Sequence, residues 1–460
     1  MKRTAQNRFK ALTSACVLSM MATVAWSQTL TWLGTLGGDW SSAFGVSADG
    51  SVVVGRSRNS TGQEIAFRWT ALGGMQPLDS RIEEITDFTP DGSVLVGYYR
   101  VNWEERAFRW TVSGGIQDLG TLPGGDRSEA YAVSADGSVV VGRARNAAGQ
   151  WRAFRWTQAT GMQDLGTLGG YSSMANDVSA DGSVVVGYAV NADGLERAFR
   201  WTEAGGMQDL GVLPNYDEGY AVAVSADGQV VLGVSKSRDF WRSPRVFRWT
   251  PNGMQDLGGP YDENPDYNEY FYIGVHDVSV DCSVAVGYMS HSDWPVSAAA
   301  FWRDYFDTFR TPSIALAVSD DGSVVLGDAS IYVDDDYVSG PVRWRQGNLE
   351  NFDFLNITYA RLLADGSYIY EASEASFDGR YIVGTGYNAA TQRVEAFLLD
   401  TGTGVNGDVN GDGCVDDSDL LQVLFAFGDT GSRLPEDLNG DGTVDDADLL
   451  EVLFNFGSGC

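Results

Sequence analysis

Two short stretches near the C-terminus carry the oxygen-bearing side chains that a hard cation prefers. They span residues 408–419 and 437–448, and each has Asp or Asn at positions 1, 3, 5, 9 and 12 with glycine at position 6. With a backbone carbonyl from position 7, this is the ligand pattern of a calcium-binding loop. The predicted ligands are Asp408, Asn410, Asp412, Cys414 (through its carbonyl), Asp416 and Asp419 in the first loop, and Asp437, Asn439, Asp441, Thr443 (through its carbonyl), Asp445 and Asp448 in the second.

The two loops are copies of one unit that repeats after 29 residues. Each runs into the same apolar pattern, at 420–425 and 449–454, which predicts a helix after each loop. An Asp-rich and Gly-rich turn that binds nothing is the alternative for a single copy. Two full copies favour a module that holds two Ca²⁺ ions, and its folding should depend on the metal because the carboxylates would otherwise repel one another.

This duplicated loop–helix unit resembles a type I dockerin, a calcium-dependent docking domain, over residues 408–460. The resemblance implies a protein partner, either a cohesin-like protein or another protein of the cell surface. In that family, loop positions 10 and 11 contribute to partner recognition. Here these positions hold Asp417, Ser418, Asp446 and Ala447, which depart from the paired hydroxyl groups usual in the family.

The chain has four cysteines, of which Cys16 lies in the predicted leader. Cys282 stands where other copies of a repeat have glycine, so it indicates drift within that repeat. Cys414 and Cys460 both lie in the C-terminal module, and we predict that they form a disulfide that holds its two ends together.

Residues 28–400 consist of a repeat that should position whatever chemistry the chain performs. Asp-Gly-Ser-Val-Val-Val-Gly or a variant of it recurs eight times at intervals of 40 to 57 residues. The Asp-Gly turn, the β-branched run after it, Ala-Phe-Arg-Trp-Thr and Gly-Met-Gln-Asp-Leu predict four antiparallel strands per copy, which is one blade of a β-propeller. The copies begin their turns at Asp49, Asp91, Asp136, Asp181, Asp227, Asp281, Asp321 and Asp378.

The two ends of the array are out of phase with the repeat. Residues 30–38 match a fourth strand, and residues 396–399 match a third strand with no fourth after it. The first segment can therefore complete the last blade and close the ring. The fold class we expect is mainly β, an eight-bladed β-propeller closed by the N-terminal strand plus a small α-helical calcium module; seven blades and a split array are the alternatives.

The repeats also resemble the extracellular HAF-repeat family. The family triplet His-Ala-Phe is replaced here by Arg-Ala-Phe at 106–108, 152–154 and 197–199, within the same strand pattern. The resemblance implies an extracellular location and supplies no catalytic residues.

The composition and the N-terminal segment indicate where the protein is located. Residues 1–27 read as a signal peptide, with basic residues followed by an apolar run too short for a membrane span, and 401–407 as a linker. The net charge of −31 over 460 residues argues against nucleic acid and anionic membrane surfaces as partners. We expect a secreted protein, free or retained at the bacterial cell surface, with no membrane span after cleavage of the leader.

Strand parity predicts where a ligand would bind. Turns after the second and fourth strands share one face of a propeller, and they hold the long segments 258–275 and 328–340. Aromatic residues on this face could stack on a glycan, although they could equally cap the blade rims. The predicted ligand-face residues are Trp103, Trp151, Trp241 and Trp294, together with the tyrosine-rich stretch around position 268, where Tyr267 and Tyr270 flank Asn268.

The residues favour a binding or structural protein, and we assign no catalytic residue. The two imidazoles, His276 and His291, have no nucleophile motif beside them, and eight similar copies do not make one asymmetric site. The alternative is a polysaccharide-degrading glycosyl hydrolase or a carbohydrate-binding accessory of an extracellular complex, because dockerin-like modules often accompany such proteins.

Overall fold

The computed structural model describes residues 28–238, 242–259, 271–291, 297–303, 306–308, 313–333, 336–345, 352–402, 409, 415, 417–428 and 444–456. The predicted signal segment 1–27 lies outside them. The chain divides into two compact units, Leu30–Leu399 and the remainder, which contains Asp400–Cys460. Among the described residues, no helix has the length and apolar character needed to cross a membrane.

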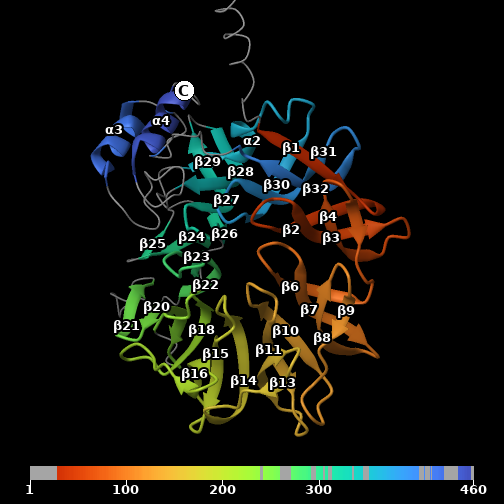
Figure 1. Cartoon of the computed structure of the whole chain (residues 1–460), viewed down its shortest axis with the longest axis vertical. Helices are drawn as coiled ribbons and strands as arrows, with labels where there is room; N and C mark the ends of the chain where they lie inside the picture. Colours follow the sequence, from red (N-terminus) through yellow and green to blue (C-terminus); the bar gives the residue numbers. More distant parts are fainter. Residues whose placement is uncertain are drawn as a thin grey trace, which may run out of the picture. The chain divides into compact units, whose positions relative to one another are not determined.

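The fold is mainly β and has the sheet arrangement of a β-propeller. In the described part of the chain, 32 strands follow one another in sets of four, with each set beside the next (Figure 1). Six sets form separate four-stranded sheets in which consecutive strands pair, and β1–β5 and β30–β32 share one further sheet. We call each set of four a blade.

The shared sheet contains β1 (Thr29–Gly34), β2 (Gly37–Val46), β3 (Val52–Asn59), β4 (Glu64–Thr70), β5 (Gly74–Pro77), β30 (Tyr368–Ala375), β31 (Tyr381–Asn388) and β32 (Arg393–Asp400). The next three blades contain β6 (Ile82–Phe88), β7 (Val94–Val101), β8 (Glu104–Thr111), β9 (Gly115–Asp118); β10 (Ser128–Val133), β11 (Val139–Arg145), β12 (Trp151–Thr157), β13 (Gly161–Asp164); and β14 (Gly169–Val178), β15 (Val184–Asn191), β16 (Glu196–Thr202), β17 (Gly206–Asp209).

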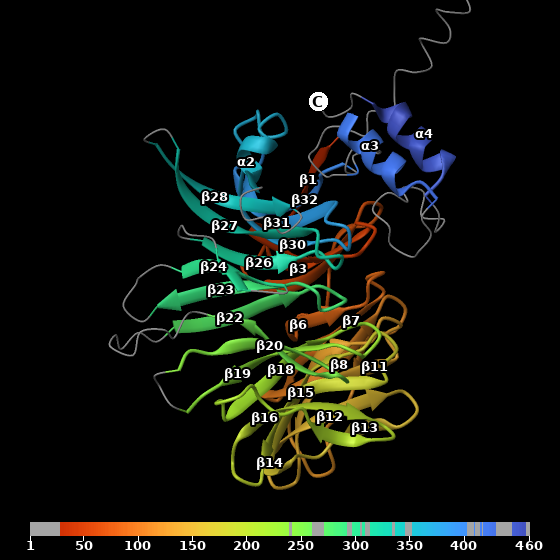
Figure 2. The ribbon, with the colours of Figure 1, turned by 90° about the vertical axis from the view of Figure 1, so that its left-hand side faces the viewer.

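The remaining blades contain β18 (Glu218–Val224), β19 (Val231–Lys236), β20 (Arg245–Thr250), β21 (Gly253–Gly258); β22 (Phe271–Val278), β23 (Ala285–His291), β24 (Ser297–Trp302), β25 (Phe306–Thr308); and β26 (Ser313–Val318), β27 (Val324–Val333), β28 (Asp336–Arg345), β29 (Phe352–Phe354). The short helix α2 (Leu355–Thr358) follows β29. In Figure 2, β22, β23 and β24 are seen side by side, as their pairing requires.

The repeat forms the strands that its sequence predicts. In the third copy, Val133 pairs with Val140 across the Asp-Gly turn, and Val140 pairs with Trp156 on the next strand. The turn is fixed by side chains, because Asp136 Oδ1 accepts hydrogen bonds from Ser134 Oγ (2.7 Å) and from the Ser138 amide (2.9 Å). These bonds hold the pKa of Asp136 below its usual value, with the Ser138 amide as the largest cause. A structural turn therefore accounts for the recurring Ser-Ala-Asp-Gly.

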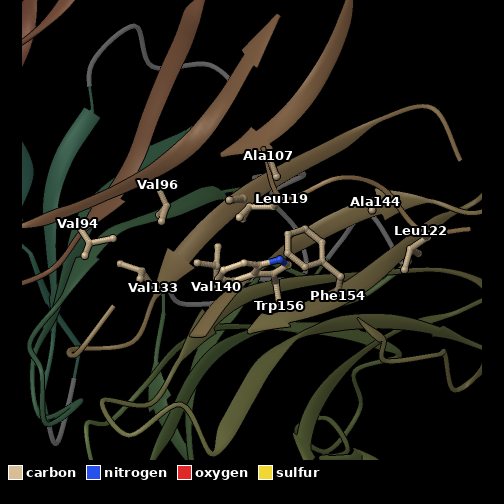
Figure 3. Packing of buried hydrophobic residues seen from close by; sticks show 11 residues of the cluster. Val94, Val96, Ala107, Leu119, Leu122, Val133, Val140, Ala144, Phe154 and Trp156 are labelled. Carbon is tan, nitrogen blue, oxygen red and sulfur yellow. The ribbon is translucent and has the colours of Figure 1, made fainter. Parts of the chain in front are cut away.

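Adjacent blades are held together by apolar packing on both faces of each sheet. Val140 and Phe154, both 0% exposed, lie in one apolar cluster with Val94 and Val96 of the preceding blade (Figure 3). Val139 and Val141, next to Val140 in the strand, instead join a cluster with the following blade. Since side chains alternate across a strand, an uninterrupted Val-Val-Val run serves both neighbours.

Polar contacts reinforce the junctions between blades. The repeated arginine of the third strand donates to the carbonyl of the turn glycine in the following blade, as Arg109 does to Gly137 (2.8 Å) and Arg155 to Gly182 (3.2 Å). A serine at the start of one blade likewise accepts a hydrogen bond from the amide of Ala153 in the blade before it (Ser173 Oγ, 2.9 Å). The repeated arginines therefore connect blades.

The two ends of the array meet. Strand β1 pairs with β32, as the out-of-phase ends predict. Leu33 is 6% exposed and packs with Val383 and Leu398 near the end of the array, and with Phe67 near its start. The Ala396 amide donates to Ser41 Oγ (2.8 Å), the same contact that joins consecutive blades elsewhere.

One segment differs from the sequence expectation, whereas Cys282 keeps the turn of the glycine that it replaces. Much of 328–340, expected as a loop, extends β27 and β28 into a long hairpin, because Ile331 and Val338 pack onto the apolar cluster of that blade. Cys282 occupies the glycine position of its turn with φ of +56°, and its amide donates to the Ser279 carbonyl (2.8 Å) as the glycines do elsewhere. Cys282 is a free, buried thiol.

The C-terminal unit contains two helices of equal length, α3 (Asp417–Ala426) and α4 (Asp446–Asn455). They pack through a small core of four fully buried valines, two from each copy of the duplicated sequence. These are Val415, Val423, Val444 and Val452. The helices predicted after the two loops are therefore present and pack together, while most of the loop residues lie outside the described part of the chain.

Replacing Leu33 by alanine should lower the free energy of unfolding by about 2–3 kcal/mol, because it removes buried methyl groups that join the two ends of the array. Urea unfolding followed by tryptophan fluorescence measures the change. Leu72→Ala is the matched control, since Leu72 is fully exposed and its loss should change stability by less than about 0.5 kcal/mol. Equal stability of the two variants would show that β1 contributes nothing to the array.

The Cys282 thiol should resist alkylation by iodoacetamide in the folded protein and react once urea unfolds it. Burial raises the pKa of this thiol and leaves little thiolate to react. Mass spectrometry of the peptide that contains Cys282 measures the modification, and a cysteine introduced by Leu72→Cys serves as the exposed control. Reaction of both thiols at one rate would mean that this turn opens in the native state.

Candidate functional site

The first strands of the blades surround a cavity of about 530 Å³. Each of these first strands contributes at least one residue to its wall. They are β2, β6, β10, β14, β18, β22, β26 and β30. The wall residues lie near the Asp-Gly turns, where the first strand of every blade has an irregular register.

Every first strand skips one residue of its pairing, at the fifth position before the turn aspartate. In β10, for example, Ala130 and Ala132 are paired while Tyr131 between them is not. The other first strands shift at the same place. Such a bulge leaves backbone groups of the strand without a ladder partner.

Carboxylates from the preceding blade bind backbone amides that lie two residues beyond the skipped residue. Asp87 Oδ2 accepts from the Val133 amide (2.8 Å), while its Oδ1 accepts from Phe88 (2.7 Å). Asp177 binds Val224 in the same way (2.7 Å). Asp277 binds Val318 (2.8 Å), so three aspartates each connect two blades.

The residue before each aspartate binds the carbonyl of the residue just before the skipped one. Thr86 Oγ1 donates to the Ala130 carbonyl (3.0 Å), and Asn176 Nδ2 donates to the Ala221 carbonyl (2.7 Å). His276 Nδ1 lies 2.8 Å from the Ala315 carbonyl. Because a carbonyl only accepts, Nδ1 carries the proton in this contact.

These polar pairs occur in alternate copies of the repeat. The fourth residue before the turn aspartate is acidic in copies two, four, six and eight and small in the others. The series is Gly45, Asp87, Ala132, Asp177, Ala223, Asp277, Ala317 and Glu374. Sequence reasoning that looked only for what the copies share missed this position, although comparing every second copy would have found it.

The cavity raises the pKa values of the carboxyl groups in its wall. Burial raises the pKa of Asp87 to about 7 and that of Asp177 and Asp277 to about 6, against the opposing effect of their backbone hydrogen bonds. Burial, followed by the charge of Asp277, raises the pKa of Glu374. The pKa of Asp320, also in the wall, is raised by burial and then by Asp321.

Two of the predicted ligand-face aromatics lie in the described part of the chain. Trp103 is 83% exposed in the two-residue turn between β7 and β8, where Asn102 (φ +51°) and Trp103 (φ +73°) both have left-handed backbone conformations. Trp151 is half-buried, with the guanidinium groups of Arg143 and Arg145 at 4.3 and 5.0 Å from its ring centre. The other predicted positions, Trp241, Trp294, Tyr267, Asn268 and Tyr270, lie outside the described residues.

Three of the twelve predicted calcium ligands are described. Asp419 and Asp448 are fully buried in the first turns of α3 and α4, and the Asp445 amide donates to Asp448 Oδ2 (2.9 Å). Burial of a carboxylate at the end of an acidic loop fits a cation ligand. Asp408, Asn410, Asp412, Cys414, Asp416, Asp437, Asn439, Asp441 and Thr443 lie outside the described residues, as does Cys460 of the predicted disulfide.

The predicted partner-binding positions lie at the start of the two helices. Asp417, Ser418 and Asp446 are exposed there, and Ala447 occupies the equivalent position of α4. The candidate site residues described above thus form two sets. One set is the carboxyl groups around the propeller cavity, and the other is the predicted calcium-binding and partner-binding residues of the C-terminal unit.

The two histidines of the propeller occupy different places. His276 lines the cavity and stacks on Tyr288 with 5.1 Å between ring centres. His291 is the last residue of β23. His276 therefore belongs to the candidate site.

The chain matches no protein-family model and no curated protein. Among solved structures, TolB from Acinetobacter baumannii is 13% identical, with 58% of this chain and 61% of that chain covered and a TM-score of 0.37. An oligogalacturonate lyase in complex with manganese is 12% identical, covering 76% of this chain and 97% of that one, with a TM-score of 0.43. An oligogalacturonate lyase from Vibrio parahaemolyticus is 10% identical, covering 81% and 97%, with a TM-score of 0.42. Likeness at this level carries no argument about what this chain binds or does.

Proposed function

We propose that the chain is a secreted, non-catalytic binding protein. In this proposal, residues 408–460 form a calcium-dependent docking module for a cohesin-like or other cell-surface protein, and the propeller is the cargo that it displays. The single observation that carries the proposal is the apolar surface that α3 and α4 each expose.

That surface is duplicated in step with the sequence. Leucines at equivalent positions of the two helices are about half exposed, while the valine two positions after the first of them is fully buried in each helix. The exposed leucines are Leu421 and Leu424 on α3 and Leu450 and Leu453 on α4, with Phe425 beside them at 85% exposed. Two helices that leave matching apolar side chains uncovered are typical of a protein-binding surface.

The propeller itself is proposed as a closed ring of eight blades. The contact between Ala396 and Ser41 supports closure, because the same amide–hydroxyl bond joins consecutive blades inside the array. The alternation of acidic and small residues supports an even number of blades. With an odd number of blades, the first and last blades would carry the same type of residue, acidic or small, at this position where they meet.

Docking is tested by pulling down the host's surface proteins with the full chain, with and without EDTA. Leu424→Asp combined with Leu453→Asp should abolish calcium-dependent capture of the partner, because each change places a charge on the exposed apolar surface of its helix. Leu72→Asp, at an exposed leucine of the propeller, is the matched control and should capture as the wild type does. Capture that EDTA leaves unchanged, or that the double variant retains, contradicts the proposal.

Calcium binding is measured by titrating the EDTA-stripped full chain in a calorimeter. We expect two Ca²⁺ ions per chain, and one after Asp412→Ala, which removes a ligand from the first loop only. Asp441→Ala makes the same change in the second loop. Absence of calcium uptake by the wild type would refute the metal assignment.

A glycan is proposed as the ligand of the propeller face that bears Trp103. The supporting observation is that a two-residue hairpin turn favours glycine after asparagine, yet an exposed indole occupies this position with positive φ. Such a conformation costs a non-glycine residue roughly 1 kcal/mol. Contact with a ligand would account for a strained, exposed tryptophan.

Trp103→Gly should raise the free energy of unfolding by about 0.5–1 kcal/mol and abolish glycan binding, because it relieves the turn and removes the stacking surface. Urea unfolding and a glycan array measure the two effects. Leu72→Gly, which removes an exposed apolar side chain elsewhere, controls for loss of surface area. Glycan binding equal in wild type and variant would exclude Trp103 from the site.

A further inference from the structure

The carboxyl groups in the cavity wall have a role that the docking and glycan proposals leave unused. They come from alternate blades and face one shared space, and three of them bind backbone amides of the next blade. We propose that Asp87, Asp177, Asp277 and Glu374 make the propeller a pH-sensitive ring, whose blade junctions are firmest in acidic solution and loosen as the pH rises through neutrality.

The geometry places these groups at the junctions themselves. Each of the three aspartates spans a contact between two first strands, and Glu374 holds the equivalent position in β30, where its Oε1 accepts from Ala375 (3.0 Å). A change in the charge of these groups therefore acts directly on the junction between two blades. The small residues of the intervening blades leave the other junctions without such a group.

The surroundings of the carboxyl groups contain acidic and neutral side chains. After burial, the negative charges of Asp177 and Asp320 raise the pKa of Asp87, and the charge of Asp320 raises the pKa of Asp277. After burial, the negative charges of Asp277 and Asp320 raise the pKa of Glu374. Ionisation therefore brings like charges together around one space.

No cationic side chain offsets these charges in the part of the wall that the structure describes. Tyr131 and His276 also line the cavity, and none of its described lining residues is Lys or Arg. His276 Nδ1 binds the Ala315 carbonyl, so that side of its ring already has a partner. The carboxyl groups thus carry the main change of charge in the cavity.

The sign of the pH effect follows from the raised pKa values. An aspartate with an unfolded pKa near 3.8 and a folded pKa of about 6 or 7 favours the folded state when it is protonated. Its contribution is fully present below the unfolded pKa and is lost as the pH rises through the folded value. The stability of the propeller should thus decline between about pH 4 and pH 8.

The test is the pH dependence of urea unfolding of the full, calcium-saturated chain. In the wild type, the equilibrium constant for unfolding should rise at least about a hundredfold from pH 5.5 to pH 8.0. Asp177→Asn combined with Asp277→Asn should reduce this rise by about tenfold or more, because two of the titrating groups are gone while His276 remains. Asp193→Asn, at an exposed turn aspartate with the same change of charge, should retain the wild-type rise.

An equal pH dependence in wild type and double variant would overturn the proposal. If the double variant does not fold, proton release by the wild type decides. Unfolding with urea in unbuffered solution at pH 6 should release about two protons per chain, because the unfolded aspartates bind fewer protons. Release of none would also overturn it. Docking and glycan binding are measured separately and at constant pH, so their failure and the failure of this proposal are distinguishable.

Discussion

A four-stranded blade has two apolar faces and cannot cover either by itself, and this constraint governs the rest of the propeller. Val139, Val140 and Val141 show it within three residues, since neighbouring valines serve opposite neighbouring blades. Each blade is stable only between two others, so a chain end would leave one apolar face in water. The pairing of β1 with β32 and the burial of Leu33 follow from the same requirement.

The strands were predictable because the repeated residues perform the same task in every copy. The Asp-Gly turn, the valine run and the Phe-Arg-Trp strand appear in the structure where the sequence places them, and so does the displaced strand at the N-terminus. The hairpin of β27 and β28 was less predictable. Its acidic tip resembles a solvated loop, and only packing of Ile331 and Val338 on their own blade reveals the longer strands.

The cavity residues escaped prediction for the opposite reason. Asp87, Asp177 and Asp277 differ from the residues at the same position in the adjoining copies, and a search for shared residues treats such differences as drift. Their role depends on backbone amides beside a bulge in the next blade, which no sequence pattern marks. Cys282 shows the contrast, because it is a single departure at a turn glycine and keeps the hydrogen bond that the glycines make.

Pairing of the first strand with the last sets an order of events in folding. During synthesis β1 exists long before β32, and about 360 residues separate the two strands. The interior blades can form as their neighbours appear, but the final junction must await the end of the array. Until then, the chain carries an unpaired strand edge at each end, which is the feature through which β-rich chains join one another. A cell that makes this protein must therefore keep separate chains apart until the last blade has been completed by the first strand.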